Sequence, residues 1–152
     1  GGVPVRTPVG HSLIKAEMAR TGAVFGGEHS GHFYFREFYL ADSGMLAGLH
    51  VLAALAETDV ELSALMAEYA RYSASGEINS RVDDADAVIE RLVRAYADHE
   101  QDRLDGLTVT AADWWFNVRA SNTEPLLRLN VEGADDDTMA RVRDEVLAEI
   151  RA

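Results

Sequence analysis

The apolar positions of the first half of the chain form short alternating runs and longer helical stripes. Apolar residues alternate with polar or turn residues at 3–5, and short apolar or aromatic runs occupy 23–25 and 32–39. A period of two is typical of half-buried strands, so we expect three strands here. Between residues 12 and 20, Leu13, Ile14 and Met18 share one helical face, and Gly22 is placed to end that helix.

A longer helical stripe follows residues 42–44. Four apolar residues recur at spacings of four and three, which predicts a helix with one buried face. They are Met45, Leu49, Leu52 and Ala56. We interpret His50, which lies within this pattern, as structural rather than as a ligand. Thr58 and Glu61 then form a capping-box pattern, which predicts that another helix begins there.

The second half has a different order of elements. From residue 76 the pattern reads β-α-β-β-β-α, with strands expected at 78–82, 107–110, 114–118 and 127–131. This order predicts an α+β domain with an antiparallel sheet and helices on one face. Residues 72–76 are small and polar, as in a connection between units. We therefore place the domain boundary between about residues 57 and 76.

Two acidic clusters precede the helices of this second half, at 83–86 and 135–137. Clustered carboxylates are compatible with a metal site. Acidic side chains are also favoured at helix N-termini, where they accept hydrogen bonds from unpaired backbone amides. We interpret both clusters as helix starts and assign no metal ligand in the chain.

Composition and charge limit the classes of partner. The 152 residues suffice for one ordinary domain, or for a small domain and part of another. A formal net charge of −12 disfavours nucleic acid and anionic membranes as main partners. No apolar run reaches the length of a membrane span, and the absence of cysteine fits a cytoplasmic location. The chain begins with Gly1 rather than methionine, so we expect a fragment of a longer protein.

The first candidate site is the glycine-bracketed loop at 26–32, which leads into the aromatic run at 33–35. Glu28 can accept two hydrogen bonds, Ser30 can donate and accept, and His32 can donate to an oxygen or a phosphate. These groups suit the recognition of hydroxyls. A hairpin whose polar tip only faces water fits the same residues. His11 begins the first expected helix, where it could approach an anion or belong to a solvated face.

The second candidate site is the segment at 119–125, Arg-Ala-Ser-Asn-Thr-Glu-Pro. Arg119 offers a planar fork of donors, and the hydroxyl and amide side chains that follow could surround a phosphate. Pro125 would stiffen the return to the next strand. The residues alone leave open a wide hairpin with an exposed arginine.

The loop Gly-Glu-His-Ser-Gly-His at 27–32 resembles the sugar-recognition loop of the α-D-phosphohexomutases, in their phosphomannomutase/phosphoglucomutase branch. The segment at 119–125 is similar to the phosphate-binding loop of the same family, and the two loops occur in the family's order. The resemblance covers essentially the whole chain, but only the C-terminal part of a full-length family member. It implies part of the sugar-loop α/β domain at 1–56, a helix and linker at 57–76, and a C-terminal phosphate-binding domain at 77–152 with a TATA-box-binding-protein-like fold.

The resemblance also implies roles for individual residues. Glu28 and Ser30 would exchange hydrogen bonds with the sugar 3- and 4-hydroxyls, and His11 and His32 would approach the sugar or its phosphate. Four residues of the second loop would hold the distal phosphate: Arg119, Ser121, Asn122 and Thr123. The implied reaction transfers a phosphoryl group between C1 and C6 of mannose or glucose through a bisphosphorylated sugar. The full-length enzyme would use magnesium and a hexose bisphosphate activator, neither bound by this chain alone.

The sequence departs from the family in lacking two catalytic patterns. The family's phosphoserine loop, Thr-Ala-Ser-His-Asn-Pro, and its magnesium loop, Asp-x-Asp-x-Asp-Arg, do not occur in this chain. We therefore expect no catalytic residue here, no mutase activity from the chain alone, and a dependence on N-terminal domains of the same protein. Two alternatives stay open. One is a fragment of the phosphoglucosamine mutase branch, whose phosphate loop usually carries glycine at the position of Asn122. The other is a non-catalytic phosphosugar-binding module.

Overall fold

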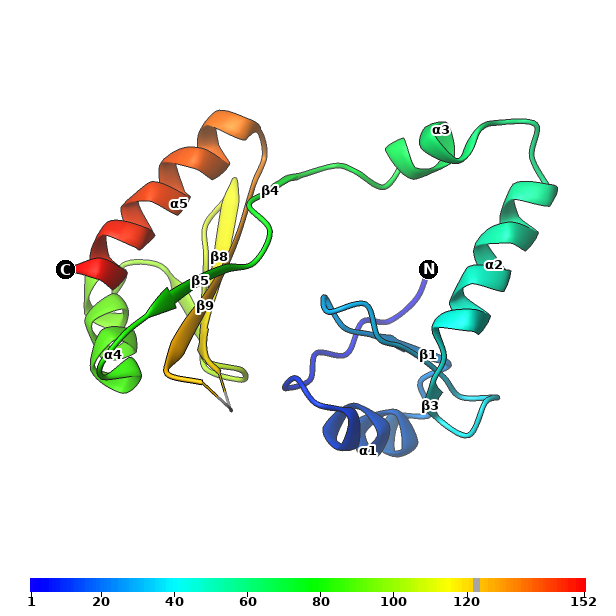
Figure 1. The fold of residues 1–152 in the computed structure, drawn as a ribbon, viewed down its shortest axis with the longest axis horizontal. Coiled ribbons are helices and arrows are strands. Elements are labelled where there is room, and N and C mark those ends of the chain that lie inside the picture. Colours follow the sequence, from blue (N-terminus) through cyan, green and yellow to red (C-terminus); the bar gives the residue numbers. More distant parts are fainter. Residues whose placement is uncertain (122–123) are drawn as a thin grey trace. The chain divides into compact units, whose positions relative to one another are not determined.

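The computed structural model describes residues 1–121 and 124–152. The chain forms two compact units, Gly1–Tyr69 and Ala70–Ala152 (Figure 1). The division falls within the segment 57–76, in which the sequence analysis placed a linker.

Unit 1 combines a small antiparallel sheet with three helices. Its elements are α1 (His11–Thr21), β1 (Phe25–Gly27), β2 (Phe33–Phe35), β3 (Ala41–Asp42), α2 (Gly44–Ala56) and α3 (Leu62–Ala67). The sheet has the order β1-β2-β3. As expected, α1 ends at Gly22, whose φ of 69° is the left-handed conformation that glycine adopts at little cost. Ser43 caps α2 by accepting a hydrogen bond from the backbone N–H of Leu46.

The core of unit 1 is small and lies between α1 and the β1–β2 hairpin. Ile14 and Met18 of α1 pack against Tyr34 of β2, and all three are buried. Tyr34 lies opposite Gly26 in β1. A Cβ atom at Gly26 would come within 2.9 Å of the Met18 sulfur and 3.3 Å of an Ile14 methyl carbon, so glycine allows this close approach of hairpin and helix without moving those side chains.

Three expectations for unit 1 are wrong. Residues 3–5 form no strand in the part of the chain that the structure describes, and Val3 is 89% exposed. A strand needs a hydrogen-bonded neighbour, and no described strand pairs with this segment. The expected capping box does not form either. The hydroxyl of Thr58 donates to the carbonyl of Leu55 at the end of α2, and α3 follows Glu61 without a side-chain cap.

The apolar stripe of α2 is the third correction. None of the residues of α2, all of which are described, is buried, and Met45, Leu49 and Leu52 are exposed. An apolar pocket of about 940 Å³ lies between this helix and the aromatic residues Phe25, Phe33 and Phe35 of the hairpin. The helical period was correct, but within the described residues nothing covers the stripe.

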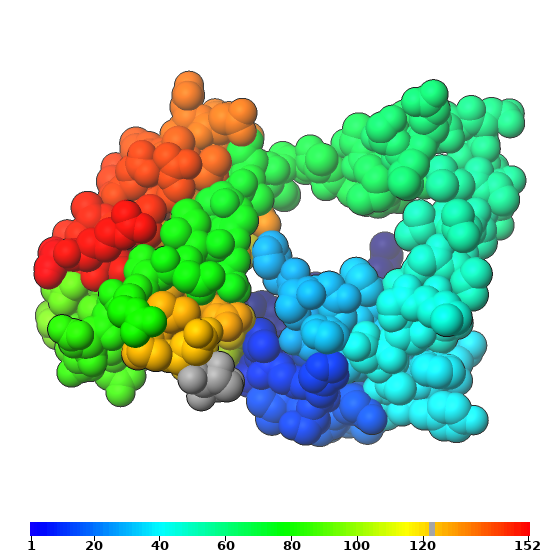
Figure 2. All heavy atoms as spheres, in the orientation of Figure 1, coloured from blue at the N-terminus to red at the C-terminus, as the bar shows by residue number. Residues whose placement is uncertain are grey.

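Unit 2 is an antiparallel sheet with two helices. Its elements are β4 (Ser73–Ala74), β5 (Ile78–Arg81), α4 (Ala85–Ala95), β6 (Glu100–Asp102), β7 (Leu107–Thr110), β8 (Trp114–Ala120), β9 (Leu126–Gly133) and α5 (Asp136–Arg151). The sheet has the order β4-β9-β8-β7-β6, and β5 also pairs with β9. Figure 2 shows α5, in orange to red, lying beside α4 along one side of this unit.

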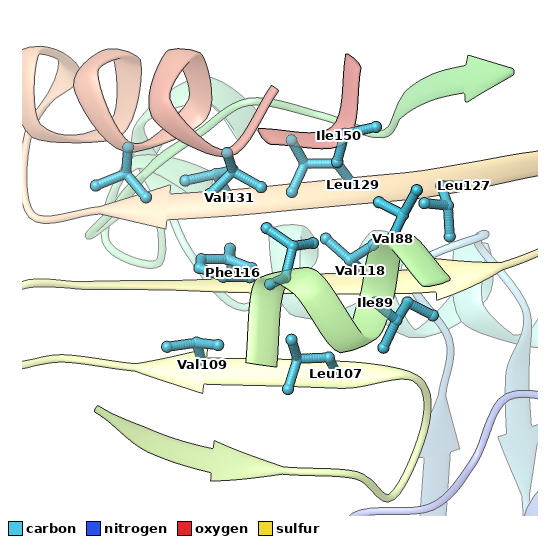
Figure 3. Packing of buried hydrophobic residues seen from close by; sticks show 13 residues of the cluster. Val88, Ile89, Leu107, Val109, Phe116, Val118, Leu127, Leu129, Val131 and Ile150 are labelled. Carbon is cyan, nitrogen blue, oxygen red and sulfur yellow. The ribbon is translucent and has the colours of Figure 1, made fainter. Parts of the chain in front are cut away.

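The core of unit 2 lies between the sheet and its two helices. Every second residue of β9 is buried, beginning with Leu127, and Phe116 and Val118 of β8 point to the same side. Figure 3 shows these side chains meeting residues of α4 and α5. The expected α+β arrangement, with helices on one face of an antiparallel sheet, is confirmed.

The acidic clusters cap the helices, as expected. Asp84 accepts a hydrogen bond from the backbone N–H of Ala87 at the start of α4, and Asp135 accepts one from Thr138 at the start of α5. In unit 2, the strands β4 and β6 were missed. Both lie at edges of the sheet, and the Glu-Gln-Asp sequence of β6 has no apolar alternation. None of the described helices is long and apolar enough to cross a membrane.

Candidate functional site

The first candidate loop is the turn of the β1–β2 hairpin. The backbone N–H of Glu28 donates to the carbonyl of His32 at 2.9 Å, and the N–H of Gly31 donates to the carbonyl of Glu28 at 3.0 Å. Gly31 has a φ of 86°, a left-handed conformation that favours glycine. Glu28, just after β1, and His32, just before β2, therefore lie next to each other at the end of the hairpin. Ser30 lies exposed in the turn between them.

His32 is held by a carboxylate from the next strand. Its Nδ1 atom lies 2.7 Å from Oδ2 of Asp42, while Oδ1 of Asp42 accepts the backbone N–H of Phe33 at 2.9 Å. The hydrogen bond to Asp42 raises the pKa of His32, and the same bond lowers the pKa of Asp42. With Nδ1 engaged in this way, Nε2 of His32 is left to meet a ligand.

Glu28 is held by the phenol of Tyr34, whose hydroxyl donates to Oε1 of the carboxylate. Tyr34 is fully buried in the core of unit 1, and this burial, together with the neighbouring Glu28 carboxylate, raises the pKa of the phenol. Tyr34 therefore stays a neutral donor at ordinary pH. A single donor from the core fixes one carboxylate oxygen of Glu28, and the other can accept from a ligand.

His11 joins this group from a different element. It is the first residue of α1, and its ring centre lies 4.6 Å from that of His32 and 5.5 Å from that of Tyr34. The structure thus brings His11, Glu28 and His32 to one place, although α1 and the hairpin loop are separate in the sequence. One ligand atom each from His11, His32 and Asp42 lie within 4.8 Å of one another, so these residues could hold a metal ion.

The second candidate loop connects β8 to β9 in unit 2. Arg119 lies near the end of β8, and its register partner in β9 is Arg128. Both guanidinium groups face the Glu77 carboxylate, at 3.6 Å for Arg119 and 3.4 Å for Arg128. All three side chains are partly buried. Two cations thus share a single anion beside the loop.

Two backbone hydrogen bonds involve described residues of this loop. The N–H of Ser121 donates to the carbonyl of Leu126 at 2.8 Å, and the N–H of Leu126 donates to the carbonyl of Glu124 at 2.8 Å. Arg119 and Ser121 are thereby placed at the same end of the β8–β9 pair. The two other expected phosphate ligands, Asn122 and Thr123, lie outside the described residues.

Sequence reasoning missed four residues that hold these groups. They are Tyr34, Asp42, Glu77 and Arg128. For Tyr34 a signal existed, because a residue two positions after His32 lies on the same strand face. Arg128 occupies a polar position in the alternating pattern of β9, which marked it only as facing away from the core. The positions of Asp42 and Glu77 depend on strand pairing, which the local pattern does not contain.

Comparisons with known proteins agree on one family. The model for phosphoglucomutase/phosphomannomutase, alpha/beta/alpha domain III, matches residues 1–72, and the model for the C-terminal domain of the same proteins matches residues 77–149. A phosphomannomutase of Methanocaldococcus jannaschii is 42% identical over 96% of this chain and 32% of its own length. A phosphomannomutase of Salmonella typhimurium is 43% identical over 97% of the chain and 33% of its own length.

A solved structure is similar as well. The crystal structure of a phosphoglucomutase/phosphomannomutase family protein from Burkholderia thailandensis matches with a TM-score of 0.78 and 32% identity. The match covers 95% of this chain and 31% of that one. The chain therefore spans about a third of the length of the relatives that it matches.

Proposed function

The chain belongs to the phosphoglucomutase/phosphomannomutase family, and from this we propose that it supplies the sugar-recognition and phosphate-recognition surfaces of a phosphohexomutase. The parent protein interconverts hexose 1-phosphate and hexose 6-phosphate, with mannose or glucose as the sugar. Within the chain, residues 1–56 belong to the sugar-loop domain, 57–76 form a helix and linker, and 77–152 form the phosphate-binding domain.

The observation that carries this proposal is the convergence of His11, Glu28 and His32 on one place in unit 1. Each is oriented by the fold, because Tyr34 fixes Glu28, Asp42 fixes His32, and α1 places His11 beside the ring of His32. Groups that are already oriented lose little side-chain entropy when a ligand binds. Glu28 accepts a hydrogen bond from one sugar hydroxyl, and Ser30 exchanges hydrogen bonds with the adjacent sugar hydroxyl. His11 and His32 donate to the sugar or its phosphate.

Phosphate recognition is proposed for the β8–β9 loop of unit 2. A phosphate monoester needs several donors and at least one permanent cation, and Arg119 supplies a planar fork of N–H groups. The hydroxyl of Ser121 adds to these, as do the side chains of Asn122 and Thr123. The neighbouring Arg128 adds positive charge. Of these residues, Asn122 and Thr123 lie outside the described part of the chain. The structural support for phosphate binding therefore comes from Arg119 and its surroundings.

A division into two surfaces suits a substrate that must react at both ends. The phosphoryl group moves between the oxygens on C1 and C6, so the sugar has to be bound in two orientations. The phosphate loop holds whichever phosphate is not reacting. The hydroxyl-reading residues contact groups that stay similarly placed in both orientations. Tight contacts to remote parts of the substrate can orient the reacting end.

The reacting groups themselves are assigned to the remainder of the parent protein. The acidic residues Asp84 and Asp135 are engaged as helix caps and do not fit a magnesium site. When bound, magnesium would neutralise charge on the transferred phosphoryl group. A hexose bisphosphate would serve as the activator, and the cytoplasm is the proposed location. We expect the chain alone to show no turnover of mannose 1-phosphate or glucose 1-phosphate, and a measurable turnover would contradict this assignment.

The binding proposal can be tested by NMR titration of this chain with mannose 1-phosphate and inorganic phosphate. We expect amide shifts around residues 28–32 with the sugar phosphate only, and shifts around 119–121 with both ligands. Arg119→Ala should abolish the second set and Glu28→Gln should weaken the first. Arg143→Ala is a matched control because Arg143 pairs with Asp144 on the exposed surface of α5. Unchanged spectra at millimolar ligand would overturn the proposal that these surfaces bind without the remaining domains.

A further inference from the structure

We propose that His11, His32 and Asp42 form a binding site for one divalent cation of the zinc class. The three residues come from three elements of unit 1: the start of α1, the end of the hairpin loop, and β3. Their nearest ligand atoms all lie within 4.8 Å of one another. Local sequence patterns do not reveal this group, because 31 positions separate the first residue from the last.

The ligand set selects the type of cation. Zinc binds imidazole nitrogen and carboxylate oxygen at about 2.0–2.2 Å, so its ligand atoms lie roughly 3.4 Å apart in a tetrahedron. His32 and Asp42 are already closer than this, at 2.7 Å. His11 is exposed, and its ligand nitrogen lies within 4.8 Å of the ligand atoms of His32 and Asp42. Magnesium prefers an octahedron of oxygen atoms, so two imidazoles disfavour it.

The frame around these ligands is largely fixed in advance. Oδ1 of Asp42 accepts the backbone N–H of Phe33, which leaves Oδ2 directed at His32. The β2–β3 pairing places Asp42 opposite Tyr34, whose buried side chain anchors the strand. His11 is attached to a helix that is packed through Ile14 and Met18. A cation that enters takes the place of the proton between His32 and Asp42, and that proton is released to solvent.

The surroundings support a cation without completing its coordination. The Glu28 carboxylate adds negative potential near His32. Three protein ligands leave the fourth tetrahedral position to water or to another oxygen donor. His11 is exposed, so the position can be reached from solvent.

The site has a consequence for the sugar surface, and this consequence alone rests on the proposed function. His11 and His32 are also proposed to contact the sugar phosphate. A cation bound to both imidazoles holds the two rings together and occupies the space between them, although each ring keeps the N–H of its other nitrogen. Zinc and the phosphosugar therefore compete for unit 1, and the site is inhibitory rather than catalytic.

The test is a titration of the chain with zinc chloride by calorimetry, together with cobalt(II) monitored by visible absorption. We expect one cation per chain and the strong absorption bands of tetrahedral cobalt. His11→Gln should weaken binding by at least the roughly 10–100-fold that loss of an outer-shell partner costs in metal sites. His29→Gln is the matched control, since His29 lies in the same loop but outside the group. Magnesium at millimolar concentration should not displace zinc.

Three results would overturn the site. They are wild-type affinity in His11→Gln, an equal loss in His29→Gln, and displacement of zinc by magnesium. His11→Gln is more informative than Asp42→Asn, because Asp42 also holds the hairpin backbone and its loss can loosen the fold. Circular dichroism of each variant verifies that the fold persists.

Competition is measured separately by repeating the zinc titration in the presence of mannose 1-phosphate. Inorganic phosphate at the same concentration controls for chelation in solution. We expect a weaker apparent zinc affinity with the sugar phosphate only. Zinc binding without competition would retain the cation site and contradict the proposed sugar contacts of His11 and His32. Sugar binding without zinc binding would retain the proposed sugar contacts and contradict the cation site.

Discussion

The Glu77 carboxylate lies 3.6 Å from the guanidinium of Arg119, the cation that we assign to phosphate binding. Its other oxygen lies 3.4 Å from Arg128, the register partner of Arg119 across β8 and β9. Both distances exceed those of ordinary N–H···O hydrogen bonds, so the contacts are ion pairs. Two arginines and one glutamate leave a net positive charge at a place where the chain as a whole carries −12. This local excess favours an anion.

Replacing Glu77 should strengthen phosphate binding. In Glu77→Gln the carboxylate no longer repels the incoming anion or neutralises the two arginines. A partly exposed charge pair is worth about 0.5–1 kcal/mol, which corresponds to roughly a two- to fivefold lower Kd for inorganic phosphate. NMR titration at low and high salt measures this, and the gain should shrink as salt rises.

The matched control is Glu145→Gln, which removes an ion-paired glutamate from α5, 3.2 Å from Arg141. It should leave phosphate affinity unchanged. If Glu77→Gln weakened phosphate binding instead, the carboxylate would be acting mainly to position Arg119, and its role as a competing charge would be wrong.

The core of unit 2 should depend on the residues that alternate inward along β9. Leu129 is fully buried, and Leu129→Ala should lower the free energy of unfolding by about 2–5 kcal/mol through lost burial and a residual cavity. Leu104 is 42% exposed, and Leu104→Ala should change the free energy of unfolding by less than about 0.5 kcal/mol. Urea denaturation can be followed by tryptophan fluorescence, which reports on unit 2 because both tryptophans lie in β8. Equal losses in the two variants would contradict this assignment of the core.

The sequence predicted the fold best where its pattern matches a complete sheet and helix layer. The period of two in β9 was read correctly, since each inward residue meets α4 or α5. The Asp84 and Asp135 caps were also read correctly, because capping is local. The pattern failed for α2, whose apolar stripe is exposed. An apolar stripe predicts which face of a helix is suited to burial. Whether that face is buried depends on another segment that packs against it.

The residues proposed to face the ligand could be named from the sequence, but the residues that orient them could not. Resemblance identified the loop of Glu28 and His32 together with the distant His11. The orienting groups Tyr34 and Asp42 depend on strand register and on burial. Asp42 in particular reaches His32 only because β3 folds back onto β2. Tertiary pairing of this kind leaves no periodic trace in a single sequence.

The N-cap of α5 should make unit 2 less stable in acid. The hydrogen bond from the backbone N–H of Thr138, at 2.7 Å, lowers the pKa of Asp135 from its ordinary value of 3.8. A lowered folded-state pKa means that the carboxylate stabilises the fold at pH above 3.8 and that this stabilisation is lost as pH falls through the folded-state value. NMR titration of the Asp135 carboxyl carbon measures the pKa directly.

Asp135→Asn tests the same linkage through stability. Asparagine keeps an acceptor for Thr138 but does not titrate, so the variant should lose less stability than the wild type as pH falls below 3.8. The stability difference between the two proteins should therefore narrow in acid. A stability difference between wild type and Asp135→Asn that stayed constant well below pH 3.8 would show that Asp135 does not stabilise the helix as a charged cap.

Gly106 should tolerate substitution far less well than Gly76, although both have positive φ, 71° and 65°. At Gly106 a Cβ atom would lie 2.3 Å from the carbonyl oxygen of Val118 and 2.8 Å from the Cα atom of Arg119. At Gly76 nothing lies within 4 Å. Gly76→Ala therefore meets only the backbone penalty of about 1–2 kcal/mol. Gly106→Ala adds a backbone clash of a further 1–3 kcal/mol or so.

A Cβ atom at Gly106 would clash with the carbonyl of Val118 and the backbone of Arg119, so relieving the clash can displace the end of β8, which carries the proposed phosphate ligand. Gly106→Ala should thus weaken binding of inorganic phosphate as well as stability, while Gly76→Ala should affect stability alone. Urea denaturation and phosphate titration on both variants separate the two effects. Normal phosphate affinity in a destabilised but folded Gly106→Ala would mean that the position of Arg119 does not depend on the close approach of Gly106 to β8.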